Sequence, residues 1–339
     1  MGLLNPMTKS KLAITLGDPS GIGPELVAKL LADEATRQEA NILLVGDDHL
    51  LRQGERQANV KVDLDAIDET DIARFKGCAQ LHIDTISENE VRPAEVTEAS
   101  GRAALRCLDK ALDLATEGLV NGVLFAPLNK AAMTKAGLAQ QDEHQYIANY
   151  INFDGHHGEI NVLDELMTTR VTSHIALKDV AAHITPDGIA NAIQLAHDTL
   201  RQAGKARPAI AVAALNPHAG DNGKFGREEI DVITPVVQSF QQKQMNISGP
   251  WPSDTVFLKA KRREVDAVVT MYHDQGQIAM KLFGFDRGVT LVGGLPIPIA
   301  TPAHGTAFDI VGQNKADIGA TRQAFNLLLR MTTKRHLST

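Results

Sequence analysis

The stretch DAVVTMYHDQGQIAMK, residues 266–281, joins an apolar run to a cluster of polar side chains. The run Ala267 to Met271 is rich in β-branched residues, which is typical of a strand buried on both faces of a sheet. The pattern stops at Tyr272-His273-Asp274-Gln275-Gly276. Ligands bind at the carboxyl ends of strands in open α/β sheets, so His273 and Asp274 are candidate metal ligands or proton carriers. The same pair suits the cap of a following helix, and this stretch alone leaves both interpretations open.

Strand patterns alternate with helix patterns along the rest of the chain. Short apolar runs predict strands at residues 12–16, 41–45, 122–125 and 208–215, and 3.6-residue periodicity predicts helices from Pro24, over 97–118 and over 320–329. This alternation predicts an α/β fold with a mostly parallel sheet. The loop GDPSGIGPE, residues 17–25, follows the first strand, but it lacks the third glycine of the dinucleotide fingerprint. It is therefore only a weak signal for anion binding.

Composition limits the classes of function. The 339 residues suffice for about two domains, and 43% hydrophobic residues support a substantial core. A net charge of −7 and 4% aromatic residues argue against nucleic acid as a partner. Cys78 and Cys107 are too few for a disulfide framework. No run is long enough to span a membrane and residues 1–10 lack a signal-peptide pattern, so we expect a cytoplasmic protein without a membrane partner.

Three histidines each come just after a strand pattern. His174, His218 and His273 are separated by 44 and 55 residues, so each ends a different predicted strand. Because such ends lie on one edge of a parallel sheet, the three side chains can converge there. Imidazole and carboxylate suit a divalent ion such as zinc, cobalt or manganese, with Asp254 or Asp274 as an oxygen ligand or as a partner of the ligands. Position alone also allows three unrelated loop histidines.

Five motifs carry a resemblance to a known family. GDPSGIGPEL, NPHAGDNGKFGREE, PSDT, YHDQGQIAMK and HGTAFDI, at residues 17–26, 216–229, 252–255, 272–281 and 304–310, closely resemble the 4-hydroxythreonine-4-phosphate dehydrogenase family. The resemblance extends in order from about residue 12 to residue 320. It implies an isocitrate/isopropylmalate dehydrogenase-like fold with two α/β domains and a cleft between them. We expect residues 1–133 with 296–339 in one domain, and residues 134–295 in a metal-binding and dimerisation domain.

The resemblance also implies the site residues. It implies a homodimer with its site at the interface and a divalent metal ion (zinc, cobalt, manganese or magnesium) on His174, His218 and His273, with His273 donated by the neighbouring subunit. The implied NAD or NADP site comprises His304, Gly305, Thr306, Ala307, Asp309, Ile310 and Asn314. The implied substrate contacts are His144, Gln145, Lys281, Thr290 and Ile299. At Gln145, Thr290 and Ile299 the family usually has Thr, Asn and Arg, and no neutral side chain replaces the bidentate anion binding of Arg.

The implied chemistry is metal-dependent oxidation of a secondary alcohol in a small, phosphorylated hydroxy acid, followed by decarboxylation where a β-carboxylate is present. The metal would act as a Lewis acid, Asp254 or Asp274 would take the proton, and Lys281 would anchor the acid group or donate a proton. Hydride would pass to the nicotinamide. Another branch of the family suggests the cis-dihydrodiol of an aromatic carboxylate as an alternative substrate. Two further alternatives are a phosphate acyltransferase on the same fold and a nonenzymatic anion-binding protein.

Overall fold

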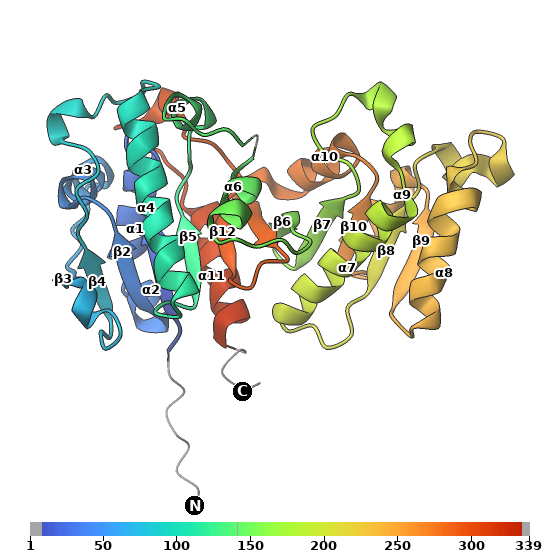
Figure 1. Ribbon diagram of the computed structural model, residues 1–339, viewed down its shortest axis with the longest axis horizontal. Coiled ribbons are helices and arrows are strands. Elements are labelled where there is room, and N and C mark those ends of the chain that lie inside the picture. Colours follow the sequence, from blue (N-terminus) through green and yellow to red (C-terminus); the bar gives the residue numbers. More distant parts are fainter. Residues whose placement is uncertain (1–8, 141, 334–339) are drawn as a thin grey trace, which may run out of the picture. The chain divides into compact units, whose positions relative to one another are not determined.

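The computed structural model describes residues 9–140 and 142–333. The chain divides after residue 154 and after residue 295 into two compact units, unit 1 (residues 1–154 and 296–339) and unit 2 (residues 155–295). Residues 1–8, which include most of the stretch tested for a signal peptide, lie outside the described part. Both units combine a sheet with flanking helices (Figure 1), so the predicted α/β class is confirmed.

Unit 1 is built on a parallel sheet with the strand order β3-β4-β2-β1-β5-β12. Its strands are β1 (Lys11–Thr15), β2 (Asn41–Val45), β3 (Asp65–Ala66), β4 (Cys78–Leu81), β5 (Gly122–Phe125) and β12 (Ile299–Pro302). Leu12, Ile14 and Leu44 on the inner strands are completely buried. Near-continuous apolar strands are expected where helices cover both faces of a parallel sheet.

The helices of unit 1 are α1 (Gly23–Ala32), α2 (Glu34–Glu39), α3 (Asp48–Ala58), α4 (Glu98–Thr116), α5 (Lys130–Lys135), α6 (Glu143–Tyr150) and α11 (Gly319–Thr333). Helix α4 begins at a threonine cap, since Thr97 Oγ1 accepts a hydrogen bond from Ser100 N at 3.0 Å. Its buried side chains, among them Leu108 and Leu112, form the stripe that the sequence predicts.

Helices α5 and α6 belong to unit 1, whereas the sequence analysis placed its boundary after residue 133. Two tyrosines of α6 bond to carboxylates of α4: Tyr146 Oη lies 2.5 Å from Asp109 Oδ1, and Tyr150 Oη lies 3.0 Å from Asp113 Oδ1. Burial raises the pKa of Tyr146, of Tyr150 and of the Asp109 carboxyl. These half-buried hydrogen bonds attach α6 to α4. Because the paired residues are far apart in the sequence, no local sequence pattern predicts the contact.

The glycines of the loop GDPSGIGPE allow close approach of backbone. A Cβ on Gly23 would lie 2.1 Å from Leu16 O, and one on Gly17, whose φ is +69°, would lie 2.5 Å from Pro127 O. Only glycine fits such contacts without moving the neighbouring chain. The loop is therefore packed against backbone at these two positions, which accounts for two of its glycines without a bound anion.

Unit 2 has the strand order β11-β6-β7-β10-β8-β9. Its strands are β6 (Gly158–Leu163), β7 (Leu166–Arg170), β8 (Ile210–Ala213), β9 (Ile247–Trp251), β10 (Ala267–Thr270) and β11 (Val289–Gly293). Strands β7, β10, β8 and β9 are parallel, while β6 is antiparallel to both β7 and β11. Its helices are α7 (Pro186–Gln202), α8 (Thr234–Gln242), α9 (Ser253–Lys261) and α10 (His273–Gly284).

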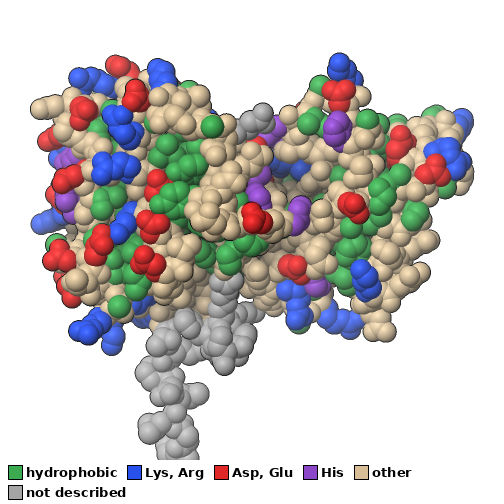
Figure 2. All heavy atoms as spheres, in the orientation of Figure 1, with side chains coloured by type: hydrophobic (Ala, Val, Ile, Leu, Met, Phe, Trp, Pro, Cys, Tyr) green, Lys and Arg blue, Asp and Glu red, His purple; other side chains and the backbone are tan. Residues whose placement is uncertain are grey.

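The surface is mixed in character. On the face drawn in Figure 2, acidic and basic side chains are interspersed, with hydrophobic side chains between them. None of the helices in the described part of the chain has the length and apolar character needed to cross a membrane.

Candidate functional site

The three histidines follow three neighbouring parallel strands of unit 2. Strand β10 lies between β7 and β8, and the chain leaves these strands toward His273, His174 and His218 respectively. Gln275 ties two of the exits together, because its Nε2 donates to Ala214 O at 2.8 Å and its Oε1 accepts from Met271 N at 2.6 Å. The exits of β10 and β8 are thus held beside each other at one edge of the sheet.

His174 and His273 lie side by side at this edge. Their ring centroids are 5.8 Å apart. His273 Nδ1 lies 2.6 Å from Asp274 Oδ1, and in the neutral tautomer with the proton on Nδ1 this nitrogen donates to the carboxylate while Nε2 keeps a lone pair for a ligand. The two rings border a hollow of about 430 Å³, which is lined by Thr172, Ser173, His174, Ile175, Leu177, Val180, Tyr272, His273 and Asp274.

The His273-Asp274 pair lies at the start of a helix. Helix α10 begins at His273, and Asp274 lies in its first turn, where a carboxylate interacts favourably with the helix dipole. The same carboxylate contacts the His273 ring, so its place at the helix start also orients the imidazole.

His218 lies in a turn with left-handed backbone. It begins a run of left-handed backbone that continues to Asn222, with φ of 52° at His218 and 58° at Asn222. Such conformations are costly for residues other than glycine, so surrounding contacts must hold them. The ring of His218 lies 6.4 Å from that of Phe225. Within residues 9–140 and 142–333, no three His, Cys, Asp or Glu side chains gather closely enough to hold a metal ion.

A buried carboxylate supports the His218 turn. Glu229, 3% exposed, accepts hydrogen bonds at Oε1 from Leu215 N at 2.9 Å and from Asn216 N at 2.7 Å. Its Oε2 accepts from Asn216 Nδ2 at 3.0 Å. These bonds fix the backbone directly before His218. The sequence analysis did not single out Glu229, and a carboxylate in an otherwise helical segment after a histidine loop is the only local signal for it.

A second polar network supports His174. The Arg170 side chain, 7% exposed, forms an ion pair with Glu159 at 2.8 Å, and its Nε donates to Ser173 Oγ at 2.9 Å. Arg170 also donates to Asn161 Oδ1 at 3.1 Å, and Gln277 of α10 donates to the same oxygen. The network links the turn before His174 to the helix that begins at His273. Its members lie on separate strands and a helix, which is why the sequence did not reveal it.

The other predicted residues of unit 2 are dispersed. Asp254 is an exposed residue in the first turn of α9, and Lys281 is an exposed residue on α10, two turns after His273. Thr290 is a half-buried residue of β11, opposite Asn161 of β6. Arg287 is paired with Asp164 at 3.3 Å. Lys281 lies on α10, the helix that begins at His273, whereas Arg287 lies in the short 3₁₀ turn after it.

In unit 1, His144 and Gln145 lie on α6. His144 Nε2 is 3.8 Å from Asp142 Oδ2, and Lys130 Nζ is 3.0 Å from Asp142 Oδ1. The structure thus brings His144 together with a lysine from the exit of β5. Ile299, by contrast, is 0% exposed within β12, among core residues.

The predicted cofactor residues occupy an irregular segment of unit 1. His304 and Gly305 follow β12, Thr306 is buried, and Asp309 and Ile310 form a short 3₁₀ turn with Phe308. Ala307 and Asn314 have left-handed backbone, with φ of 43° and 55°. A Cβ at Gly305 would meet nothing within 4 Å, so a ligand can approach the backbone there.

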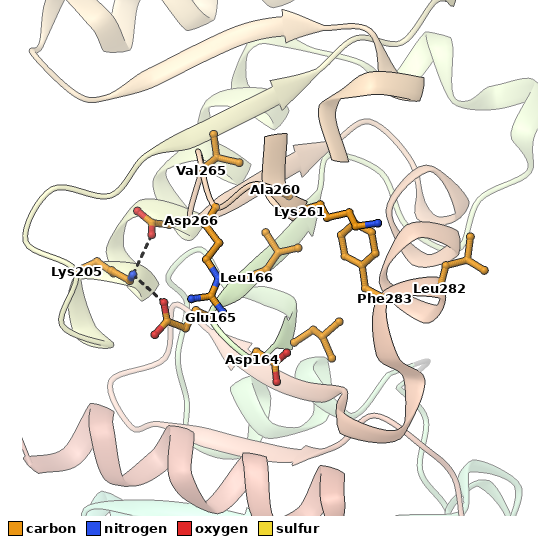
Figure 3. Close-up of a pocket in the computed structure, with 12 residues that line it drawn as sticks. Asp164, Glu165, Leu166, Lys205, Ala260, Lys261, Val265, Asp266, Leu282 and Phe283 are labelled. Carbon is orange, nitrogen blue, oxygen red and sulfur yellow. Dashed lines mark hydrogen bonds and ion pairs between the residues drawn. The ribbon is translucent and has the colours of Figure 1, made fainter. Parts of the chain in front are cut away.

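A second hollow of about 470 Å³ lies at the opposite ends of the strands β7 and β10. Figure 3 shows Lys205 between Glu165 and Asp266, with which it forms ion pairs at 3.4 and 3.1 Å. Leu166 and Phe283 contribute apolar surface beside them. The acids and the lysine largely neutralise one another, and none of the predicted site residues lines this hollow.

Comparison with known proteins identifies the class. A β-decarboxylating dehydrogenase of Thermococcus kodakarensis, 13% identical, has a similar fold with a TM-score of 0.50 over 95% of this chain and 83% of that chain. The crystal structure of a 4-hydroxythreonine-4-phosphate dehydrogenase from Klebsiella pneumoniae is much more similar, with 34% identity and a TM-score of 0.84 over 97% of this chain and 99% of that chain. The chain thus shares its fold with both of these dehydrogenases.

The family model for "Pyridoxal phosphate biosynthetic protein PdxA" matches residues 38–328, and the chain belongs to this family. A Pseudomonas aeruginosa protein named "Putative 4-hydroxythreonine-4-phosphate dehydrogenase 2" is 49% identical over 97% of this chain and 98% of its own length. The D-threonate 4-phosphate dehydrogenase of Pectobacterium atrosepticum is 38% identical, over 90% and 94%. The terephthalate 1,2-cis-dihydrodiol dehydrogenase structure from Burkholderia xenovorans is 27% identical, with a TM-score of 0.68 over 95% and 98%. The family resemblance is confirmed, and the protein is a dehydrogenase of CH–OH groups that uses a nicotinamide cofactor.

Proposed function

We propose that this protein is a metal-dependent, NAD(P)-linked dehydrogenase of a phosphorylated four-carbon hydroxy acid, such as 4-hydroxythreonine 4-phosphate or D-threonate 4-phosphate, with decarboxylation after oxidation. The observation that carries the metal-dependent part is the His174–His273 pair, with its 5.8 Å ring separation and the Asp274 carboxylate on His273 Nδ1. The names of the relatives support the substrate class.

The residues present fit a divalent ion in part. Two imidazoles at one strand edge, one of them oriented by a carboxylate, are a donor set of the kind that zinc, cobalt or manganese prefers. We assign the ion to His174, His218 and His273, with one histidine supplied by a second subunit, because no group of three forms among the described residues of a single chain. When bound, the ion would supply Lewis-acid stabilisation of an oxyanion.

The chain's own groups then have separate tasks. Asp274 holds the proton of His273 Nδ1 and keeps the ring oriented. Asp254 is an exposed carboxylate at the start of α9 and is assigned to take the alcohol proton. Lys281 is assigned to anchor the acid group of the substrate, because it lies on α10, the helix that begins at His273.

Phosphorylated substrates are favoured over a cis-dihydrodiol. The relatives named for phosphorylated acids are 38% and 49% identical to this chain, whereas the dihydrodiol dehydrogenase is 27% identical. Within unit 1, His144 is a candidate substrate contact, and it lies with Lys130 around Asp142.

A homodimer through unit 2 is part of the proposal. The large hydrophobic side chains that are exposed in the described part of the chain all lie in unit 2: Ile175, Leu177, Phe225, Ile230, Leu258, Ile278 and Leu282. Ile278 and Leu282 of α10 are 61% and 82% exposed, on the helix that begins with His273. A second copy that covers α10 would bury this apolar surface beside the histidine pair.

The activity is tested with metal-free protein to which zinc, cobalt, manganese or magnesium is added singly, together with NAD or NADP. The substrate panel contains phosphorylated four-carbon hydroxy acids, their unphosphorylated forms and a dihydrodiol of an aromatic carboxylate, and the reduced nicotinamide is followed by absorbance. We expect turnover only with metal and a phosphorylated acid. Turnover of the dihydrodiol alone, or undiminished turnover without metal, would contradict the proposal.

A matched pair of variants tests the histidine assignment. His273→Ala is expected to abolish both metal binding and turnover. His197→Ala is the control, because His197 and Asp198 form an adjacent His–Asp pair at 3.1 Å on α7, away from the strand exits. Equal loss in both variants would contradict the assignment.

Mixing variants tests the contribution of the second subunit. If one site combines His218 of one copy with His273 of the other, a mixture of His218→Ala and His273→Ala proteins forms heterodimers with one intact site and regains about a quarter of the activity. If each site is built within one chain, the mixture stays inactive, which contradicts the shared site.

A further inference from the structure

The segment from Thr306 to Ala316 has little regular structure of its own. Its internal backbone hydrogen bonds include those from Ile310 N to Ala307 O and from Gln313 N to Ile310 O, both 3.1 Å. A segment of this kind keeps one shape only when neighbouring elements hold it.

The start of the segment is held by the loop before α1. Ile22 N donates to Thr306 O at 3.1 Å, and Asn129 Nδ2 donates to Thr306 Oγ1 at 3.4 Å. A Cβ on Gly21 would lie 2.7 Å from Thr306 Cβ, so the threonine occupies the space that this glycine leaves open. The motif GDPSGIGPE thus contacts the predicted cofactor segment directly.

The end of the segment is held by an ion pair on α1. Glu25 is completely buried, and its Oε1 accepts hydrogen bonds from Ala316 N at 2.9 Å and from Lys29 Nζ at 2.8 Å. Lys29 Nζ in turn donates to Ala316 O at 2.9 Å and to Asn314 O at 3.4 Å. The pair therefore binds an N–H and two carbonyl oxygens of one short stretch of backbone.

Apolar packing links the two ends. Ile22, Leu26 and Ala316 form a small buried cluster, against which Ala307, Ile310 and Val311 pack. The inner side of the segment is thus fixed by α1, while Asp309 and Asn314 are exposed. Asp309 and Asn314, which are available to a ligand, thus lie on a backbone whose other side is bound by the Glu25–Lys29 ion pair.

We propose that Glu25 and Lys29 are positioning residues that set the affinity for the nicotinamide cofactor, by fixing the backbone between Thr306 and Ala316. This inference rests on the proposed assignment of the cofactor to that segment. Neither side chain needs to touch the cofactor. Their effect is that the segment is ordered before binding, so that the cofactor does not have to supply the ordering free energy itself.

The test compares Glu25→Gln, Lys29→Met and the double variant with Glu98→Gln. The double variant leaves no buried charge without a partner. It can therefore be measured even if a single variant fails to fold. Glu98→Gln is the matched control, because Glu98 and Arg102 form an exposed i,i+4 ion pair at 2.7 Å on α4 that does not touch the segment. The measurements are hydrogen exchange of residues 306–316 in the cofactor-free enzyme and equilibrium binding of NADH and NADPH by fluorescence.

We expect faster exchange of the segment and about tenfold weaker dinucleotide binding in the Glu25 and Lys29 variants. The Michaelis constant for the dinucleotide should rise while kcat and the substrate's Michaelis constant stay near those of the wild type. Unchanged exchange overturns the positioning role. Faster exchange with unchanged dinucleotide binding overturns the link to the cofactor. Absence of dinucleotide binding in the wild type overturns the proposed function itself, and the inference with it.

Discussion

Glu25 in unit 1 and Glu229 in unit 2 are two buried carboxylates that hold loops by different means. Glu25 accepts a backbone N–H and a lysine, and that lysine binds two further backbone carbonyls. Glu229 accepts two backbone N–H groups and an asparagine amide, and no Lys or Arg of the described chain lies within ion-pair distance. Each anchors a segment that carries predicted ligand-binding residues.

The difference shows two ways to bury a carboxylate. A buried ion pair can lose both partners together at little net cost, because desolvation nearly cancels the attraction between the charges. A carboxylate that is surrounded by neutral donors has no such compensating change, since its removal leaves backbone N–H groups buried and unpaired. The His218 turn, with its left-handed backbone, should therefore depend on Glu229 more strongly than the 306–316 segment depends on Glu25.

The largest expected effect is that of Glu229→Ala. It removes the acceptor of Leu215 N and Asn216 N, so we expect a loss of about 3–5 kcal/mol in the free energy of unfolding and zinc affinity weakened by about 10–100-fold. Glu229→Gln, which retains an acceptor oxygen, should lose less. Urea unfolding and competition with a chromophoric chelator measure the two effects.

The control for Glu229 is Asp231→Asn. Asp231 forms an exposed ion pair with Arg227 at 2.7 Å, close to Glu229 in sequence. We expect almost no change in stability or in zinc affinity for this variant. If Glu229→Ala binds zinc as the wild type does, the His218 turn does not carry a metal ligand.

The second prediction is a double-mutant cycle at Glu25 and Lys29. Each single change, Glu25→Gln or Lys29→Met, should lower the free energy of unfolding by about 2–3 kcal/mol, because it leaves either the 19% exposed Lys29 or the fully buried Glu25 without its partner. The double variant should recover about 1–2 kcal/mol of the summed loss. Thermal or urea unfolding measures the cycle, and strict additivity would show that the two charges do not compensate each other.

The sequence predicted the parts of the fold that local patterns determine. The strand at 41–45 is found as β2 with the same bounds, and the helix expected over 97–118 is α4. The three histidines follow neighbouring parallel strands. The ends of parallel strands share one edge of a sheet, and applying this rule to a sequence requires no long-range information.

What the sequence could not predict depends on contacts between distant residues. Strand β12 lies in a Pro/Gly-rich stretch without a strand pattern, and the β6–β7 hairpin breaks the parallel order. The glycines before α1 resemble an anion loop locally, yet the space beside Gly21 is filled by Thr306. The pairing of Glu25 with Ala316 is equally invisible to motif analysis, since nothing in either segment specifies the other.

A third buried carboxylate, Asp18, gives the next prediction. Asp18 is 1% exposed, and its Oδ1 accepts from Ser20 N at 2.8 Å, without the several donors that surround Glu229. Burial raises its pKa to about 6. A carboxyl with a raised pKa in the folded state stabilises the fold at pH below its unfolded pKa of 3.8, and this contribution is lost as the pH rises through about 6.

Asp18→Asn should therefore raise the free energy of unfolding at pH 7 by about 2 kcal/mol relative to the wild type, and the gain should vanish near pH 4. Asp33→Asn is the control with the opposite sign, because a hydrogen bond from Thr36 lowers the pKa of Asp33. The loss of stability of Asp33→Asn relative to the wild type should grow as the pH rises. A pH-independent effect of Asp18→Asn would mean that Asp18 does not titrate in this range.

The smallest effect is expected from Glu98 and Arg102, and it isolates burial as the variable. This pair has the same i,i+4 spacing as Glu25 and Lys29 and a similar distance, 2.7 against 2.8 Å, but its side chains are 60% and 52% exposed. Water and salt screen such a pair, so a double-mutant cycle should give a coupling of at most about 0.5 kcal/mol, and less at high salt. A coupling as large as that of Glu25 and Lys29 would show that helical spacing, and not burial, gives the α1 pair its strength. Such a result would remove the energetic argument that Glu25 and Lys29 anchor the 306–316 segment through their burial.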